Sequence, residues 1–315
     1  MVHDLVKGDV EFEGGFIGDF IIMKSDGTAS YNFAVVIDDH LMKITHIIRG
    51  DEHLINTPRQ ILIYEAIGKD IPKFAHISMI LAPDHTKLSK RHGTTSVGEF
   101  REKGYLPQAL VNYLALLGWA PKDNREIFEL KDLVEVFSTD GIAKNPAIYD
   151  IQKLNWLNRH YIKNADTDSL TKLSLVFFEK AGIVSKEMPD EKYNWFKKLN
   201  ELFKEQYDHI DEIVEKSKVL FTNNIEYSDE AKEIISSDTS KKVIEEFYNK
   251  VSQTNELTSD KISEILKSIQ KDTGIKGKNL YMPVRITTTG CLHGPDLPKL
   301  LELIGKEKII KRIQR

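Results

Sequence analysis

The sequence predicts an α/β region at the N-terminal end of the chain and an all-α region after it. In the first part, short apolar or β-branched runs alternate with helical patterns, as in the β-to-α units of a parallel sheet. From Asp168 to the end, nearly every segment carries apolar residues at helical spacing, and short polar turns separate these segments. The two patterns indicate at least two domains, which a chain of 315 residues is long enough to form.

The first elements follow one another closely along the chain. Residues 1–13 alternate like a strand, and residues 20–23 form a short apolar run, expected to be a strand, before a turn and a helical pattern. Residues 44–48 are rich in β-branched side chains, and a helix then begins near Pro58. This order predicts a strand that leads into a helix within a parallel sheet.

A parallel sheet of this kind binds its ligands beyond the carboxyl ends of the strands. The apolar run of residues 74–81 predicts a buried strand, and residues 82–93 form a polar, basic loop without periodicity. This loop is therefore a candidate part of an active site. A doubly wound sheet also needs earlier strand–helix units with a phosphate-binding turn, and the sequence shows none before residue 20. We therefore expect either an unusual fold or a piece of a longer protein.

Helical patterns dominate the chain after this loop. Pro107 stands at a plausible first helical position, and an apolar stripe continues from it to Gly118. A short helix is expected after Leu130, and another over residues 149–160.

The composition excludes several classes of protein. Hydrophobic residues make up 41% of the chain and charged residues 29%, which is too apolar for intrinsic disorder and too mixed for a fibrous repeat. Cys291 is the only cysteine, so one chain can build neither a disulfide framework nor a thiolate zinc site. No segment resembles a signal peptide, and no apolar run approaches the roughly 20 residues that cross a bilayer. We therefore expect a cytoplasmic protein without a membrane partner.

The formal net charge of -4 does not by itself indicate a nucleic-acid-binding protein, because phosphate binding usually requires a basic surface. Residues 87–91 and 306–315 are locally basic and could form such a surface while acidic residues face elsewhere. The second cluster is explained more simply as the solvated face of a helix.

The string Lys87-Leu88-Ser89-Lys90-Arg91 is the strongest indication of chemistry. Composition alone would explain it as a solvated loop. Its position after a predicted sheet strand favours a binding loop, because flexible lysines there can neutralise a polyphosphate as charge builds up on a leaving group.

This string resembles the KMSKS signature of class I aminoacyl-tRNA synthetases, in the Lys-Leu-Ser-Lys-Arg form of the glutamyl enzymes. Other stretches resemble bacterial-type glutamyl-tRNA synthetases in the same order and spacing. These stretches are residues 31–40, 47–53, 56–60, 104–107, 112–119, 282–285, 288–290 and 293–295. The resemblance covers essentially the whole chain.

The resemblance implies a division into three parts. Residues 1–95 would be the second half of a Rossmann-like class I catalytic domain, residues 96–160 a helical stem-contact region, and residues 161–315 an all-α anticodon-binding domain. The implied activity is that of a glutamate–tRNA ligase, which uses ATP with Mg²⁺ to convert L-glutamate to glutamyl-adenylate. The glutamyl group then passes to the 3′ end of tRNA(Glu), and the family suggests a monomer.

The resemblance also implies roles for the residues of the basic loop. Lys90 matches the position that contacts the ATP phosphates, with Lys87 and Ser89 assisting it in catalysis. Leu88 and Arg91 complete the ATP-binding loop.

Three further residues match binding positions of the family. Arg49 and Tyr31 match the glutamate pocket, where a guanidinium fork suits a carboxylate better than an ammonium does. Taken alone, an arginine at a strand end is more often part of a surface ion pair, and a tyrosine more often a half-buried aromatic. Glu52 matches a position near the ATP ribose or adenine, although it could equally be a capping residue ahead of Pro58.

No metal site is expected in this chain. Asp38, Asp39 and His40 have the composition of a metal or acid–base cluster, but they match structural positions of the family. Some relatives bind zinc in an inserted acceptor-stem domain, which has no counterpart in this sequence.

The family's HIGH motif is also missing, because no His-X-Gly-His string occurs in the sequence. The resemblance therefore predicts the activity of the intact enzyme, whereas this chain alone is expected to lack part of the active site. Two alternatives stay open: a noncatalytic tRNA-binding module, and one half of a split enzyme completed by a separate chain that carries the HIGH motif. A glutaminyl-specific relative is disfavoured, because the second half of the chain is helical in pattern rather than β-barrel-like.

Overall fold

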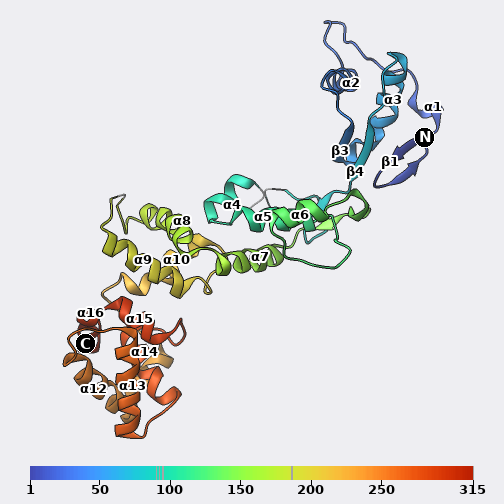
Figure 1. The fold of residues 1–315 in the computed structure, drawn as a ribbon. Helices are drawn as coiled ribbons and strands as arrows, with labels where there is room; N and C mark the ends of the chain where they lie inside the picture. The colour runs from blue at the N-terminus through green and yellow to red at the C-terminus, as the bar shows by residue number, and fades with distance from the viewer. Residues whose placement is uncertain (90, 92, 94–95, 186, 315) are drawn as a thin grey trace. The chain divides into compact units, whose positions relative to one another are not determined.

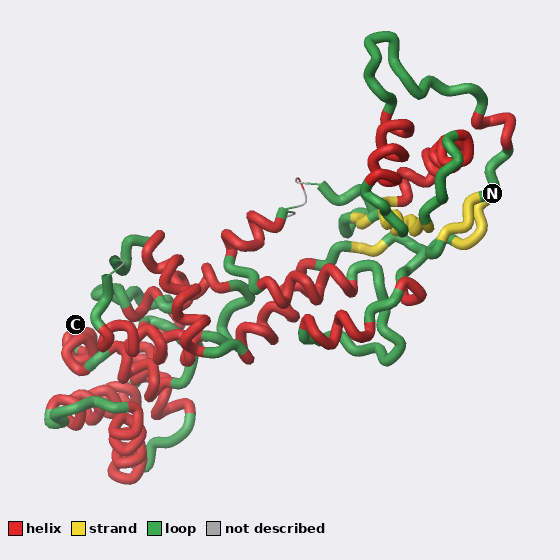
Figure 2. Tube along the Cα trace, turned by 45° about the horizontal axis from the view of Figure 1, so that its top comes forward, coloured by secondary structure: helices red, strands yellow, loops and turns green. Residues whose placement is uncertain are grey.

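The chain forms two compact units in a computed structural model that describes residues 1–89, 91, 93, 96–185 and 187–314. The N-terminal unit comprises Met1–Phe100 and Pro107–Leu157, and the C-terminal unit comprises Arg101–Leu106 and Asn158–Arg315. In Figure 2 the described strands belong to the N-terminal unit, whereas the described part of the C-terminal unit consists of helices, turns and loops. This distribution confirms the predicted change from an α/β region to an all-α region.

A four-stranded mixed sheet lies in the N-terminal unit, with the strand order β2-β1-β4-β3 (Figure 1). The alternating residues at the start of the chain form a hairpin, in which β1 (Val2–Asp4) pairs antiparallel with β2 (Gly8–Val10). Strand β4 (Lys73–Ile77) lies between β1 and β3 (His46–Gly50) and runs parallel to both. The register places Arg49 opposite His76, so these two side chains meet near the carboxyl ends of the strands.

Helix α3 (Thr57–Ala66) follows β3 through the short 3-10 helix η1 (Asp51–Asn56), which confirms the predicted strand-to-helix unit. Its proline lies in the first turn, where a missing N–H is tolerated. Helix α2 (Tyr31–Leu41) packs against α3 around a small apolar core. The core consists of Val36, Ile63 and Tyr64, with Phe20, Phe33 and Ile67 partly buried around it.

The strand expected over residues 20–23 does not form. After the short helix α1 (Gly14–Ile17), the chain makes a hydrogen-bonded turn, and Met23 and Ala29 form an isolated antiparallel bridge beside it. The side chains of Ile21 and Met23 are exposed. An apolar run predicts a strand only where a sheet covers it, and in the structure no neighbouring strand among the described residues pairs with residues 20–22.

The rest of the N-terminal unit combines a two-stranded parallel sheet with short helices. Strands β5 (Ile80–Leu81) and β6 (Ala147–Ile148) form the small sheet. The helical elements are α4 (Val97–Lys103), α5 (Pro107–Leu116), α6 (Leu130–Val136), η3 (Thr139–Gly141) and α7 (Ile151–Asn164). The last residues of α4 and of α7 belong to the C-terminal unit. Trp119, Phe128 and Leu133 form a buried cluster beside α5 and α6. The helices expected after Pro107, after Leu130 and around residues 149–160 are thus confirmed.

The C-terminal unit contains the remaining helices. They are α8 (Thr167–Lys180), α9 (Asp190–Phe203), η4 (Ile210–Glu212), α10 (Ile213–Lys216), η5 (Lys218–Leu220), α11 (Asp229–Ser236), α12 (Asp238–Ser252), α13 (Ser259–Thr273), α14 (Lys278–Thr289), α15 (Leu297–Ile304) and α16 (Lys306–Ile313). No described helix of the chain is long and apolar enough to cross a bilayer.

Side-chain caps explain where several of these helices begin. The first residue before α8, α11, α12, α13 or α15 is an aspartate, serine or threonine whose oxygen accepts from a backbone N–H three positions later. Such a cap is worth about 1 kcal/mol, because it satisfies an N–H that has no partner inside the helix. The buried faces of the helices then meet around large aromatic side chains such as Phe178, Phe196 and Phe247.

Gly104 allows a close approach within the C-terminal unit. Its φ is +80°, and a Cβ atom at this position would lie 2.7 Å from Cβ of Ile210 and 3.0 Å from Cζ of Phe177. Gly182 has a similar φ of +71°, but a Cβ there would meet nothing within 4 Å.

We expect Gly104→Ala to lower the free energy of unfolding by about 2–4 kcal/mol, because left-handed backbone strain and overpacking act together. Gly182→Ala should cost only the backbone strain, about 1–2 kcal/mol. Urea unfolding of the two variants measures the difference. Equal losses would show that close packing at Gly104 does not matter.

Candidate active site

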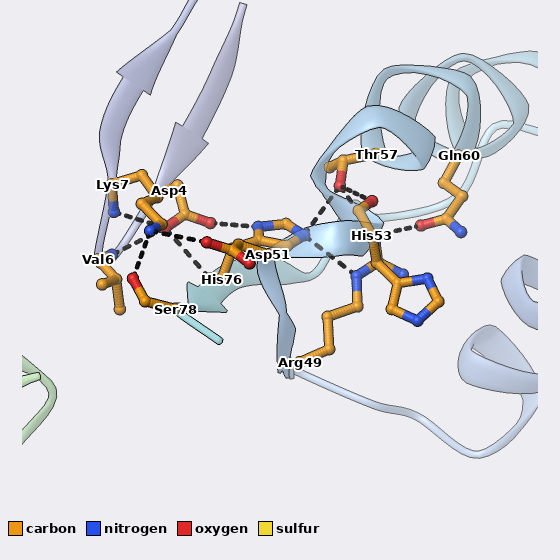
Figure 3. Close-up of polar contacts among 10 residues, drawn as sticks. All are labelled: Asp4, Val6, Lys7, Arg49, Asp51, His53, Thr57, Gln60, His76 and Ser78. Carbon is orange, nitrogen blue, oxygen red and sulfur yellow. Dashed lines mark hydrogen bonds and ion pairs between the residues drawn. The ribbon is translucent and has the colours of Figure 1, made fainter. Parts of the chain in front are cut away.

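The guanidinium of Arg49, near the end of β3, is held by three side chains (Figure 3). Its Nε donates a hydrogen bond to Nε2 of His76 at 3.1 Å. Its Nη2 donates to Oγ1 of Thr57 and to Oε1 of Gln60, each at 2.8 Å. The guanidinium carbon also lies 5.6 Å from the centroid of the Phe74 ring. These contacts fix the plane of the guanidinium fork.

His76 connects Arg49 to a buried carboxylate. The side chains of His76 and Asp4 are both fully buried, and Nδ1 of His76 lies 2.6 Å from Oδ2 of Asp4. The other oxygen, Oδ1, accepts from the backbone N–H groups of Val6 at 2.9 Å, Lys7 at 2.8 Å and His76 at 3.2 Å. Burial alone would raise the pKa of Asp4, but the hydrogen bonds from Lys7, His76 and Val6 lower it below its ordinary value. Asp4 is therefore ionised and can only accept hydrogen bonds.

The ionised Asp4 determines the protonation of the His76 ring. Nδ1 must carry the hydrogen that Asp4 accepts, which leaves Nε2 as the acceptor for Arg49. Burial lowers the pKa of His76 below its ordinary value, although Asp4 opposes this shift, so the ring is neutral near pH 7. Arg49 consequently donates to three uncharged groups and keeps its own positive charge.

The structure brings Tyr31 into the neighbourhood of Arg49. Tyr31 opens α2, and its ring centroid lies 6.0 Å from that of His53. Burial lowers the pKa of Arg49, while Tyr31 and Asp39 oppose that shift. The Tyr31 side chain is exposed, so a ligand can reach it. The two residues that sequence analysis assigned to one pocket therefore do lie near each other.

The side-chain amides of Gln60 on α3 and Asn32 on α2 connect both helices to Arg49. Gln60 accepts from Arg49 and donates through Nε2 to Oδ1 of Asn32 at 3.0 Å. The position of the guanidinium thus depends on both helices as well as on β3.

Glu52 is exposed and lies three residues beyond Arg49, in the first turn of η1. A Cβ atom added to Gly50 would overlap the Glu52 carboxylate, so the glycine leaves room for this side chain. Asn56, the residue directly before α3, makes no side-chain capping hydrogen bond.

The ammonium of Lys7 contacts three groups of the surrounding framework. Nζ of Lys7 lies 3.2 Å from Oδ2 of Asp51 and donates to Oγ of Ser78 at 2.7 Å (Figure 3). It also donates to the carbonyl of Lys144 at 2.9 Å. The Ser78 hydroxyl also donates to that carbonyl at 2.6 Å. This ammonium holds the ends of β3 and β4 to the segment before β6.

The basic loop begins directly after β5. Its first part folds back, because Ala82 N–H donates to the Thr86 carbonyl, and Leu88 N–H donates to the Ile80 carbonyl at 3.2 Å. Lys87 forms an isolated bridge with Leu81, and Ser89 follows it. Arg91 donates to Oγ1 of Thr86 at 3.3 Å. Lys90, the residue expected to contact the phosphates, lies outside the described residues.

The residues that hold Arg49 were not predicted from the sequence. Thr57 and Gln60 were part of a recognised stretch without an assigned role, and Asp4 and His76 were not singled out. One signal was present, because His76 is the one titratable side chain in the apolar run of residues 74–81. Its partner Asp4 lies 72 positions away, which no local pattern reveals.

Among the described residues, no group of three or more histidine, cysteine, aspartate and glutamate side chains is arranged to hold a metal ion. Asp38, Asp39 and His40 occupy successive positions on α2. Burial raises the pKa of Asp39, and Arg49 opposes this shift.

Two family models together match nearly the whole chain. Residues 1–156 match the family described as tRNA synthetases class I (E and Q), catalytic domain, and residues 169–315 match the family described as anticodon binding domain. The N-terminal match is thus to a class I tRNA synthetase catalytic domain of the glutamate and glutamine branch, and the C-terminal match is to an anticodon-binding domain, in agreement with the resemblance of the sequence motifs.

Curated relatives specify the resemblance further. Glutamate–tRNA ligase 1 of Caldicellulosiruptor saccharolyticus is 51% identical over 315 residues, which are 100% of this chain and 65% of that protein. Glutamate–tRNA ligase of Bacillus subtilis is 45% identical over 99% of this chain and 65% of its own length. The chain thus spans about 65% of the length of these relatives.

A solved structure has the same fold. The glutamate tRNA ligase of Elizabethkingia meningosepticum, crystallised in complex with its amino acid, superposes with a TM-score of 0.88 at 31% sequence identity. The match covers 99% of this chain and 64% of that chain.

The neutral state of His76 predicts a pH dependence of stability. The folded chain binds a proton at His76 less readily than the unfolded chain, whose histidine has the ordinary pKa of 6.5. The contribution is therefore fully present above pH 6.5 and is lost as the pH falls through the lowered pKa of the folded state. We expect the loss of stability in His76→Gln, measured by urea unfolding, to be larger at about pH 7.5 than at about pH 5.

His46→Gln provides the control, because His46 is an exposed residue at the start of β3. Its effect should be small at both pH values. A loss of stability in His76→Gln that does not change with pH would contradict the neutral assignment of this ring.

Proposed function

We propose that Arg49 binds the side-chain carboxylate of L-glutamate in a protein that acts as a glutamate–tRNA ligase. The supporting observation is the charge state of the Arg49 cluster. A partly buried guanidinium that donates to three uncharged groups, His76, Thr57 and Gln60, retains a full positive charge in a fixed orientation. Such a group is suited to an anionic, planar ligand group such as a carboxylate. Tyr31 supplies a hydroxyl beside it for a second polar contact.

In this proposal the loop after β5 serves the nucleotide. Lys87, Ser89 and Lys90 act on the phosphates of ATP, which enters with Mg²⁺ as substrate. Leu88 and Arg91 complete the binding loop. A compact ammonium on a flexible stem can follow the phosphates as negative charge moves onto the leaving pyrophosphate. Glu52, which the small Gly50 admits close to the end of β3, accepts hydrogen bonds from the ribose hydroxyls.

The proposed reaction has two steps. The α-carboxylate of glutamate attacks the α-phosphate of ATP to give glutamyl-adenylate and pyrophosphate, and a terminal hydroxyl of tRNA(Glu) then takes the glutamyl group and releases AMP. Both steps depend on positioning and charge stabilisation. The match of residues 169–315 to an anticodon binding domain supports tRNA as the partner. We further propose residues 96–160 as the stem-contact region, a monomeric state, and the cytoplasm as the place of action.

The proposal is tested by ATP–pyrophosphate exchange with glutamate and tRNA(Glu), run with Lys90→Ala as the control. One arm uses this chain alone, and a second adds the part of the Caldicellulosiruptor relative that the chain does not cover. We expect glutamate-dependent exchange in the second arm and its loss in Lys90→Ala, because the lysine ammonium stabilises charge on the phosphates.

Each outcome of this test identifies one kind of protein. Exchange by the chain alone would mean that its own residues assemble a working site. Exchange only after addition would mean that a second segment completes the site. Binding of tRNA without exchange in either arm would identify a noncatalytic module and would contradict the ligase proposal.

The role of Arg49 makes a separate prediction. Arg49→Lys keeps the charge but loses the planar fork, so the KM for glutamate should rise about 10–100-fold, as expected for lost hydrogen bonds to a charged group. The KM for ATP should stay within about twofold. Steady-state exchange measures both constants, with Arg125→Lys, an exposed arginine paired with Asp123, as the matched control. Equal increases in both KM values would contradict a glutamate-specific role.

A further inference from the structure

The buried pair of Asp4 and His76 determines which way the hydrogen bonds run toward Arg49. Oδ1 of Asp4 accepts from three backbone N–H groups, those of Val6, Lys7 and His76, while Oδ2 faces Nδ1 of His76 (Figure 3). On the far side of the ring, Nε2 faces the Nε–H of Arg49 at 3.1 Å and the hydroxyl of Thr57 at 3.1 Å. One carboxylate therefore sets the tautomer, and the tautomer in turn supplies the acceptor that Arg49 needs.

We propose that Asp4 and His76 are positioning residues that orient the Arg49 guanidinium without neutralising it, and that they thereby set the preference of the site for an anionic ligand. This inference rests on the proposed glutamate-binding function. Neither residue touches the ligand. Both act through Arg49.

The neutral state of the His76 ring explains the preference of the site for an anionic ligand. A carboxylate in the position of His76 would form an ion pair with Arg49 and remove the charge that attracts a substrate carboxylate. A protonated ring would repel the guanidinium and would offer no lone pair to Nε–H. The neutral Nδ1–H form accepts the hydrogen bond and leaves the positive charge for the ligand. Glutamate and glutamine have nearly the same shape, so this charge is what separates them.

The charged groups around His76 come from three elements. Asp4 approaches from β1, Arg49 from β3 and Asp51 from η1. Asp51 is engaged by Lys7 at 3.2 Å, whereas Asp4 makes the direct bond to the ring. Asp4 is therefore the group whose change should alter the tautomer.

Asp4→Asn tests the inference with a nearly isosteric change. Three backbone N–H groups point at the position of Oδ1, so the amide oxygen must occupy that position. The amide NH₂ then faces Nδ1 of His76, which has to become an acceptor, and the ring hydrogen moves to Nε2. Two donors, Nε2–H and the Nε–H of Arg49, now face each other. Arg49 loses its hydrogen bond to His76, one of its three side-chain hydrogen bonds, while the backbone hydrogen bonds that hold the hairpin stay in place.

The first readout is the tautomer, observed on the chain itself by ¹⁵N-detected NMR of the histidine rings at about pH 7.5, where the ring is neutral. We expect the Nδ1–H form of His76 in the wild-type chain and the Nε2–H form in Asp4→Asn. Nε2–H as the main form in the wild type would overturn the inference, whether or not any variant folds or any activity is found.

The second readout is kinetic, in the sample that shows glutamate-dependent exchange. For Asp4→Asn we expect the KM for glutamate to rise about tenfold and the preference for glutamate over glutamine to fall about tenfold, as for the loss of one hydrogen bond to a charged group. The KM for ATP and the kcat should stay within about twofold. A purely structural role would instead lower thermal stability and change both KM values together.

Asp9→Asn is the matched control, because Asp9 lies in the same hairpin and pairs with His3 on the exposed surface. It should change neither the tautomer nor the kinetics. An inverted tautomer in Asp4→Asn with an unchanged KM for glutamate would refute the positioning role while the proposed function stands. A wild-type sample without exchange would instead count against the proposed function, and the NMR result would still decide whether His76 holds Arg49.

Discussion

A short series of buried hydrogen bonds, from Asp4 through His76 to Arg49, connects the elements of the N-terminal unit that surround the candidate site. It joins β1, β4 and β3 side by side, and Thr57 and Gln60 extend it into α3. A buried carboxylate and a guanidinium in direct contact would cancel each other's charge. A neutral imidazole between them satisfies both groups and keeps them apart, so each retains its ionised form in the interior.

Lys7 and Lys87 differ in whether their ammonium groups contact the rest of the N-terminal unit. Lys7 lies behind the ends of the strands, but its ammonium is occupied by Asp51, Ser78 and the Lys144 carbonyl. It therefore stabilises the framework and is a poor candidate for binding phosphate. Lys87 lies on the loop after β5, where one backbone bridge joins it to Leu81, and its ammonium makes no hydrogen bond or ion pair with the described residues. A side chain that is not committed to the framework is the one that can follow a moving substrate.

Much of the fold could be predicted from local sequence patterns. The helices after Pro107 and Leu130 and those of the C-terminal unit follow from apolar spacing and from caps, which are properties of neighbouring residues. The strand-to-helix unit around Arg49 could also be predicted, because it follows from the properties of neighbouring residues. Residues 20–23 were misread because an apolar run does not say whether another element will cover it.

The residues of the candidate site likewise fall into some that the sequence predicted and some that it did not. Arg49, Tyr31 and Glu52 could be named because each stands in a stretch that resembles a known family. The residues that support Arg49 could not, because their roles arise from strand pairing. Asp4 meets His76 only through the parallel contact of β1 with β4, and His76 meets Arg49 only through the register of β3 with β4.

That register has a consequence for how such a sequence can diverge. Arg49 pairs with His76 at one step of a parallel ladder, and a single inserted residue in β3 or β4 would shift the pair by about 3.3 Å and turn one side chain to the opposite face. The connection between α3 and β4 imposes no such condition. Changes of length among descendants should therefore collect between residues 67 and 72, while β3 and β4 keep their length even where most of their side chains are replaced.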